Sequence, residues 1–272
     1  MSGRGALQGG ASGSRDAGGL GPLALKAENV SVSYRVKIDR GTPADTSGSR
    51  FRRPPDRIVR AVNGVSFDLP RGEVLAVIGR NGAGKSTLLR VLAGILVPDQ
   101  GRVAVWGRIS LFAIGLGFNS HLTGRANIML GGLAQGIEPK QLERLAAQIG
   151  EFAQLGEFLD YPVHSYSTGM RSRLGFAVAS HLDPDVLLID EALGGGDAAY
   201  KDRAQARMKQ MCSEGRTIVL VTHGLKSVKG MADRALWMHQ GKVAAVSEDT
   251  DAVVARYMRF CRMENMALDE EG

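Results

Sequence analysis

A glycine-rich segment, Gly79-Arg-Asn-Gly-Ala-Gly84-Lys85-Ser86-Thr87, has the residue types and spacing needed to bind phosphate. Glycines let the backbone curl so that successive N–H groups point at phosphate oxygens, and the positive end of a following helix adds attraction. Lys85 is placed to reach β- and γ-phosphates, and the Ser86 hydroxyl to bind Mg²⁺. A glycine-rich turn that binds nothing is the alternative, but the apolar run before it and the helical pattern after it reduce a chance match to well under about one per cent. The residues expected to contact phosphates are Gly79, Asn81, Gly82, Gly84, Lys85, Ser86 and Thr87.

Two adjacent acids, Asp190 and Glu191, end the apolar run VLLI at 186–189. At the carboxyl edge of a sheet, such carboxylates lie close to a bound phosphate. We expect Asp190 to hold Mg²⁺, directly or through water, and Glu191 to orient and partly deprotonate an attacking water. A solvated turn is the alternative for the acids alone, and the phosphate loop upstream favours the catalytic role.

The elements that position these residues alternate between strands and helices. Alternating strands and helices predict an α/β fold with one open, mainly parallel sheet. Strands are expected at 27–36, 74–78, 102–106, 186–189, 217–221 and 235–238. Helices are expected at 86–96, before Pro98, at 198–211 and at 225–231, and the region of about 119–182 is expected to be a helical insert.

Composition fits a folded chain of 272 residues with 44% hydrophobic and 23% charged residues. Residues 1–22 are glycine-rich and predict a flexible tail. The net charge is +6, and most of it lies at 35–60, where eight Arg or Lys and three Asp leave +5. Because the excess is confined to one apparent loop and is not spread over a whole face, no nucleic-acid partner is expected.

The two cysteines, Cys212 and Cys261, have no metal-ligand spacing and cannot form a disulfide framework. No run of 18 apolar residues is present, so we expect no membrane span. The N-terminus lacks the apolar stretch of a secretory signal.

Tyr166-Ser167-Thr168-Gly169-Met170 resembles, in degenerate form, the LSGGQ signature of ATP-binding cassette (ABC) proteins. The order of motifs is similar to that family over about residues 24–246. The resemblance implies a P-loop NTPase fold with an antiparallel β subdomain and a helical subdomain insert. Ser167 and Gly169 would offer a hydroxyl and backbone N–H groups to an anion. An ordinary helix cap is the alternative for Ser167.

In the family, two cassettes pack head to tail, and each ATP lies between one phosphate loop and the other chain's signature. The resemblance therefore implies a homodimer across ATP. Asp197 matches the aspartate that lines the opposing site, and His223 matches the histidine that contacts the γ-phosphate. Tyr34 matches the aromatic residue that stacks on adenine, and a strand-end Tyr packed on the core is its alternative.

One departure concerns the Gln that the family usually places before the helical insert, where it contacts Mg²⁺ and the transport domain. No Gln or Glu occurs between Ser110 and Thr123. Asn119 and His121 are the nearest polar residues, and neither is assigned this role.

Three variants, GLGFNSHLTGRANI, SYSTGM and DEALGGGDAAY, resemble ATP-binding subunits that export O-antigen, teichoic acid and related polysaccharides. The resemblance implies an ATPase at the cytoplasmic face of the bacterial cell membrane, with two copies of it serving two permease subunits and a lipid-linked polysaccharide. We expect a nucleotide-binding domain at 23–246 and a helical tail at 247–272, without the additional carbohydrate-binding domain of some members. The Gly-, Ala- and Arg-rich composition suits a high-GC bacterium, and an actinobacterial galactan exporter is one specific candidate.

Other functions remain open at this stage. They are another ABC transporter, a soluble ABC ATPase acting on a ribosome or DNA, and a regulatory module that binds ATP without hydrolysing it. The basic segment 35–60 either attracts anionic headgroups or a substrate pyrophosphate, or it is a solvated loop.

Overall fold

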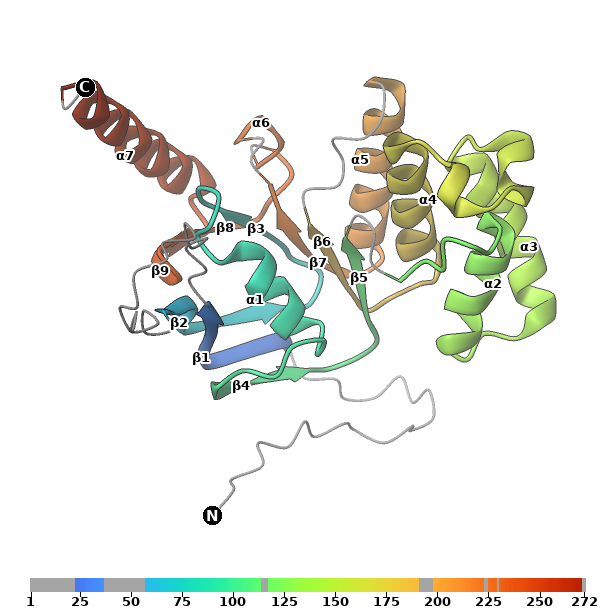
Figure 1. Ribbon diagram of the computed structural model, residues 1–272, viewed down its shortest axis with the longest axis horizontal. Coiled ribbons are helices and arrows are strands. Elements are labelled where there is room, and N and C mark those ends of the chain that lie inside the picture. The colour runs from blue at the N-terminus through green and yellow to red at the C-terminus, as the bar shows by residue number, and fades with distance from the viewer. Residues whose placement is uncertain are drawn as a thin grey trace, which may run out of the picture.

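The computed structural model describes residues 23–36, 57–113, 117–190, 198–222, 225–228 and 230–270. Two sheets and a group of helices make up this part of the chain (Figure 1). The segment 1–22, most of the basic segment and three candidate site residues (Glu191, Asp197 and His223) lie outside the described residues. None of the helices in the described ranges is both long and apolar enough to span a bilayer.

The main sheet has six strands in the order β5-β6-β7-β3-β8-β9, and only β9 runs antiparallel to its neighbour. Its central strands are short apolar runs, and all five residues of β3 are buried. Continuous apolar runs are typical of parallel strands covered on both faces. The strands are β5 (Ile109–Ala113), β6 (Val186–Asp190), β7 (Thr217–Val221), β3 (Val74–Ile78), β8 (Arg234–His239) and β9 (Lys242–Ser247).

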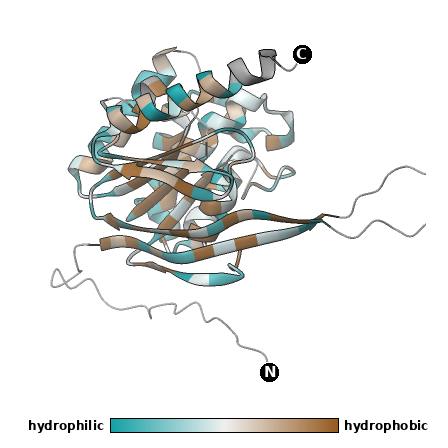
Figure 2. Ribbon diagram, turned by 90° about the vertical axis from the view of Figure 1, so that its left-hand side faces the viewer, coloured by the Kyte–Doolittle hydropathy of each residue, from teal (hydrophilic) through white to brown (hydrophobic). Residues whose placement is uncertain are grey.

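The second sheet is antiparallel, in the order β2-β1-β4. Its strands are β1 (Leu23–Val36), β2 (Arg57–Pro70) and β4 (Gln100–Val105). It forms a separate layer beneath the main sheet (Figure 2). Helix α1 (Lys85–Leu92) packs between the layers through Leu88, Leu89 and Leu92, which are almost fully buried. The predicted mainly parallel sheet, the antiparallel subdomain and the helical insert are therefore all present.

The helical subdomain lies beyond the β5 edge of the main sheet, at the right of Figure 1. Pro139 occupies the first turn of α3, a favoured position for proline, and Leu142, Ala146 and Ile149 form its buried stripe. This stripe packs against α2 and α4 in a core of its own. The elements are α2 (Gly124–Ala134), α3 (Pro139–Phe152), the 3₁₀ turns η1 (Gly156–Asp160) and η2 (Val163–Ser165), and α4 (Thr168–His181).

The remaining helices follow β6, β7 and β9: α5 (Ala198–Ser213), α6 (Leu225–Val228) and α7 (Thr250–Glu270). α5 packs against α4 and β7, so it links the helical subdomain to the main sheet. α7 packs on β8 through Val253, Val254, Tyr257 and Phe260.

The end of α1 differs from the prediction. The helix was expected to run from 86 to 96, but it ends at Leu92 because Gly94 adopts a left-handed conformation with φ 71°. The Gly94 N–H donates to the Val91 carbonyl and the Ile95 N–H to the Arg90 carbonyl, which closes the last turn. The glycine, and not Pro98, is the stop signal.

Candidate nucleotide-binding site

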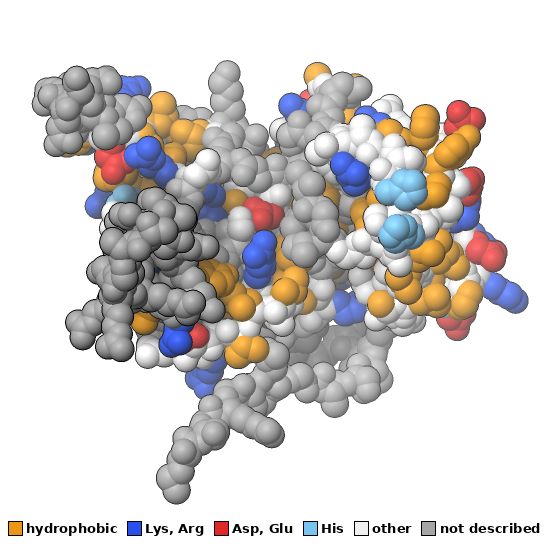
Figure 3. Space-filling view, viewed as in Figure 1, with side chains coloured by type: hydrophobic (Ala, Val, Ile, Leu, Met, Phe, Trp, Pro, Cys, Tyr) orange, Lys and Arg blue, Asp and Glu red, His pale blue; other side chains and the backbone are white. Residues whose placement is uncertain are grey.

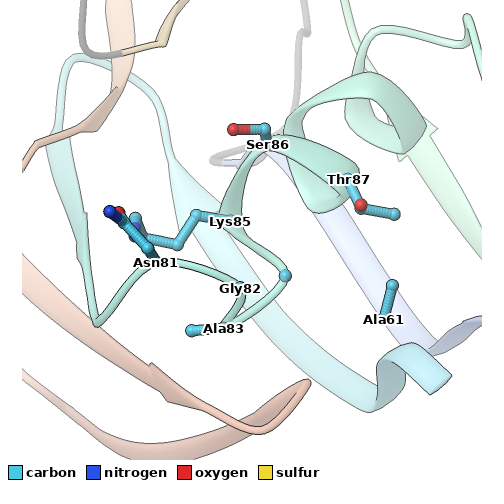
Figure 4. Close-up of a pocket in the computed structure, with 8 residues that line it drawn as sticks. Ala61, Asn81, Gly82, Ala83, Lys85, Ser86 and Thr87 are labelled. Carbon is cyan, nitrogen blue, oxygen red and sulfur yellow. The ribbon is translucent and has the colours of Figure 1, made fainter. Parts of the chain in front are cut away.

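The phosphate loop connects the carboxyl end of β3 to the amino end of α1 (Figure 4). Gly82 and Gly84 have φ of 78° and 99°, in the left-handed region that favours glycine. A Cβ at Gly84 would lie 2.0 Å from the Ala61 carbonyl oxygen of β2, whereas one at Gly82 would have nothing within 4 Å. Gly84 therefore allows the loop to lie directly against β2.

Lys85 closes this loop on itself. Its side chain is buried, and Nζ donates to the Gly79 carbonyl at 2.7 Å and to the Arg80 carbonyl at 2.9 Å. The lysine cation is thus held beneath the curled backbone. A cation held against main-chain carbonyls is available to a stronger anionic acceptor that enters the loop.

A cavity of about 260 Å³ opens above the loop. Ala61 of β2 lines one side, and the other lining residues are Asn81, Gly82, Ala83, Gly84, Lys85, Ser86 and Thr87 (Figure 4). The first turn of α1 contains no acidic residue, so its positive end is not offset by a carboxylate of its own. The cavity therefore combines backbone N–H groups, a lysine and a helix N-terminus, which suits phosphate.

Asp190 reaches the same region from a distant part of the sequence. It ends β6, which is separated from β3 by β7, and all three strands are parallel. Their carboxyl ends therefore meet at one edge of the sheet. The Ser86 hydroxyl and Asp190 Oδ1 are 3.2 Å apart, although the two residues are 104 positions apart in the sequence. A hydroxyl and a carboxylate beside a phosphate loop are the oxygen ligands that Mg²⁺ takes.

Tyr34 lies near the end of β1, on the other side of α1's first turn. Its hydroxyl is 3.5 Å from Thr87 Oγ1, and 38% of the residue is exposed. Tyr34 therefore contacts a residue that lines the cavity, and it is not a core residue.

Ser167 is the N-cap of α4, and its Oγ accepts a hydrogen bond from the Met170 N–H at 3.1 Å. Tyr166 anchors this turn: its ring is buried, and its hydroxyl donates to the Phe158 carbonyl at 2.5 Å. Burial raises the pKa of Tyr166. Ser167 therefore does cap α4, and the backbone N–H groups near Gly169 lie at an exposed end of this helix. Within this single chain, no described contact brings Ser167 to the phosphate loop.

The loop before α2 is held by Asn127, a residue that the sequence analysis did not single out. Asn127 is buried; its Nδ2 donates to the Asn119 and Thr123 carbonyls at 3.0 and 2.9 Å, and its Oδ1 accepts from the Asn119 N–H at 2.8 Å. Asn119 Oδ1 accepts from the His121 N–H at 3.0 Å, so the Asn119 side chain is engaged in the turn. A polar residue on the buried face of a helix was the available signal. Residues 114–116, where the family's strand leads into the insert, lie outside the described ranges.

Glu191, Asp197 and His223 have no described position. Glu191 directly follows Asp190, and His223 follows Thr222 just beyond β7. Their roles therefore rest on the sequence.

Comparison with known proteins identifies a domain of this chain. The ABC transporter family profile matches residues 62–194. Teichoic acids export ATP-binding proteins TagH are 37% identical in Bacillus cereus (91% of this chain, 44% of the relative), 42% identical in Listeria innocua (75% and 61%) and 42% identical in Levilactobacillus brevis (85% and 66%). The chain thus spans about half the length of the curated relatives it matches.

Solved structures agree on the fold. An ATP-binding subunit of an ABC transporter superposes with a TM-score of 0.69 at 23% identity, covering 84% of this chain and 91% of that one. A dimeric ATP-binding cassette in a post-hydrolysis state, bound to ADP and Pi, superposes with a TM-score of 0.69 at 20% identity, covering 82% and 97%. The chain therefore contains an ABC transporter domain, and over most of its length it is similar to ATP-binding proteins named for teichoic acids export.

Proposed function

We propose that the chain binds and hydrolyses ATP to power export of a lipid-linked cell-envelope polysaccharide through a separate membrane permease. The observation that carries the ATPase is the approach of Ser86 to Asp190, 3.2 Å apart at the mouth of the closed phosphate loop. The relatives carry the export role, because each is named as a teichoic acids export protein. A galactan is one member of this cargo class.

The phosphate loop binds the triphosphate through the backbone N–H groups of Gly79, Asn81, Gly82 and Gly84 and through the first turn of α1, which includes Thr87. Lys85 exchanges its carbonyl acceptors, Gly79 and Arg80, for phosphate oxygens. A charge-assisted contact to phosphate is stronger than one to a neutral carbonyl, so the exchange favours the bound state.

Ser86 and Asp190 fit Mg²⁺, because a hydroxyl oxygen and a carboxylate oxygen already lie together beside the phosphate cavity. The ion, when bound, neutralises charge on the β- and γ-phosphate oxygens. Glu191 accepts the proton of the attacking water, and His223 contacts the γ-phosphate. Lys85, Glu191 and His223 are therefore the catalytic residues of this proposal.

A second copy completes the site. Ser167 and Gly169 at the exposed end of α4 contact the γ-phosphate held by the other chain, and Asp197 lines that opposing site. Tyr34 stacks on adenine, which is supported by its partial exposure and its position beside Thr87. The functional unit is therefore a homodimer that closes across two ATP molecules.

The transport path belongs to a partner. We infer two permease subunits and two copies of this chain, with the ATPase bound peripherally at the cytoplasmic face of the cell membrane. The export relatives, at 37–42% identity, favour this arrangement over an ABC ATPase that acts on a ribosome or DNA.

Affinity purification from gently solubilised membranes tests the partner. A tagged Glu191→Gln chain, in which hydrolysis is blocked, should retain a polytopic membrane protein in a 1:1 ratio in the presence of ATP. A Lys85→Ala chain, which should not bind ATP and so should not form the ATP-dependent dimer, is the matched control. Recovery of ribosomes or DNA, with no membrane protein, would reject the export role while leaving the ATPase intact.

A further inference from the structure

A second cavity, of about 680 Å³, lies away from the phosphate loop. The turn between α2 and α3 and the exposed side of α3 form one wall, and Arg108, Leu182 and Asp183 form the other. It therefore lies where the helical subdomain meets the start of β5 and β6, at the opposite end of α4 from Ser167. Its size is within the range of small-molecule sites.

Two cations on α3 face this cavity without acidic partners. Lys140 and Arg144 are one helical turn apart, so they share a face of α3. Neither pairs with a carboxylate within the part of the chain that the structure describes. The first turn of α3 also lines the cavity and contains no acidic residue, but Glu138 at its N-cap offsets the helix dipole, so the positive field comes from the two side chains.

The acidic residues of the lining do not cancel this field. Asp183 Oδ1 accepts from Arg216 at 2.5 Å, and its Oδ2 is 3.5 Å from Arg108, so its charge is already balanced. Glu138 is the other lining acid, at the N-cap of α3. The two positive charges of Lys140 and Arg144 therefore outnumber the single negative charge of Glu138 by one.

One residue of the lining has an unsatisfied amide oxygen. Gln135 Oε1 is buried and has no hydrogen-bond partner, although Gln135 lines the cavity. A buried acceptor without a donor costs about 1–3 kcal/mol, so a donor from a ligand or water is expected there. Gln148, one turn beyond Arg144, adds a second amide to the same lining.

His181 provides a neutral group in this lining. Its Nδ1 donates to the Ala177 carbonyl at 2.8 Å, because a carbonyl can only accept, so Nε2 is left as an acceptor. Burial against Phe152 lowers the pKa of His181, and Arg207 nearby lowers it further. The ring is thus an uncharged acceptor near neutral pH.

We propose that this cavity binds the phosphate ester of a sugar, with the phosphate at Lys140 and Arg144 and the sugar hydroxyls at Gln135 and Gln148. Lys140 and Arg144 attract the phosphate, and the unsatisfied Gln135 Oε1 accepts from a sugar hydroxyl with the Gln148 amide beside it, so each half of the ligand has its own set of partners. Free sugar phosphates and the headgroups of lipids that carry one share this chemistry. The site is independent of the proposed ATPase activity.

Calorimetric titration of the full chain with glucose 1-phosphate tests the proposal in the absence of nucleotide. Saturable binding is expected, with glucose alone and inorganic phosphate alone each at least tenfold weaker. Vesicles of phosphatidylcholine with phosphatidylinositol form a second arm, which shows whether a lipid-borne headgroup is also bound.

Variants assign the binding to this cavity. Lys140→Gln with Arg144→Gln should weaken it at least tenfold, whereas Lys201→Gln with Lys209→Gln, an equal charge change on exposed positions of α5, should leave it unchanged. Gln135→Leu should weaken it without lowering the melting temperature, because it removes an unpaired acceptor.

Lys85→Ala separates this site from the phosphate loop. Binding of glucose 1-phosphate should persist in that variant, even though ATP no longer binds. The proposal is overturned if neither the soluble compound nor the vesicles bind, if Lys85→Ala abolishes binding, or if the α3 and α5 double variants behave alike.

Discussion

Replacing Gly84 with alanine should damage the phosphate loop far more than the same change at Gly82. Both glycines have positive φ, so each substitution costs about 1–2 kcal/mol of backbone strain. Only Gly84 lies against β2, where the new Cβ would be 2.0 Å from the Ala61 carbonyl oxygen. Because real Cβ atoms essentially never approach another heavy atom closer than 3.0 Å, the loop and β2 must separate by about 1 Å or more.

Forced separation of packed backbone adds about 1–3 kcal/mol. Gly84→Ala should therefore be less stable than Gly82→Ala by that amount, which corresponds to roughly 3–10 °C in melting temperature for a domain of this size. The displacement also moves Lys85, whose Nζ is fixed by the Gly79 and Arg80 carbonyls. A shift of about 1 Å in a positioning group can cost about 100-fold in rate.

Thermal denaturation of both variants, without and with ATP, measures these effects in one experiment. Gly82→Ala should melt a few degrees below the parent and still be stabilised by ATP, whereas Gly84→Ala should melt lower and gain little from ATP. Equal melting temperatures and equal stabilisation by ATP for the two variants would refute the packing of the loop on β2.

Three further tests address separate parts of the protein. Ser167→Ala removes the N-cap of α4 and Thr123→Ala removes that of α2, and each should lower the free energy of unfolding by about 1 kcal/mol. Only Ser167→Ala should also abolish ATP-dependent dimerisation, measured by gel filtration. Loss of dimerisation in both variants would assign the effect to folding. Tyr34→Ala should weaken ATP binding by about 1–3 kcal/mol if the ring stacks on adenine, whereas Tyr34→Phe should bind like the parent; equal loss in both would point to the hydroxyl contact with Thr87 instead. Because the pKa of His181 is lowered in the folded state, the unfolded chain binds a proton at this residue first as pH falls below about 6.5. The free energy of unfolding should then decrease by up to about 1.4 kcal/mol per pH unit. His181→Phe should remove this slope in urea titrations, and an unchanged slope would show that other groups cause it.

The strand–loop–helix unit of the phosphate loop was predictable because its signals agree. The apolar run at 74–78 coincides with β3, and the glycines and Lys85 that follow require a curled loop. The end of α1 differs from the prediction because the left-handed φ of Gly94 ends the helix before Pro98 is reached.

Strand β9 was not predicted. It follows β8 through a tight turn at Gln240 and Gly241, which have φ of 48° and 78°, and the turn lacks the Asn-Gly or Asp-Gly sequence that usually signals such a hairpin. The local signal for this hairpin is therefore weak, and β9 also packs against β2 and α7, which lie far from it in the sequence or follow it.

For the candidate site too, some features could be predicted from the sequence and others could not. The approach of Ser86 to Asp190 could be inferred, because parallel strands present their carboxyl ends at one edge. The role of Asn127 could not be inferred, because it depends on how the loop at 119–123 folds over the amide. The cavity beside α3 likewise brings together segments around 108, 140 and 182, which no motif connects.

ATP hydrolysis by the purified chain tests the central claim most directly, with Lys85→Ala and Glu191→Gln measured beside the parent. The parent should hydrolyse ATP in a Mg²⁺-dependent manner. Lys85→Ala should neither bind nor hydrolyse it, and Glu191→Gln should bind ATP, dimerise and turn over at least about 100-fold more slowly, as expected for loss of a general base. Hydrolysis by Lys85→Ala at the parental rate would contradict the account.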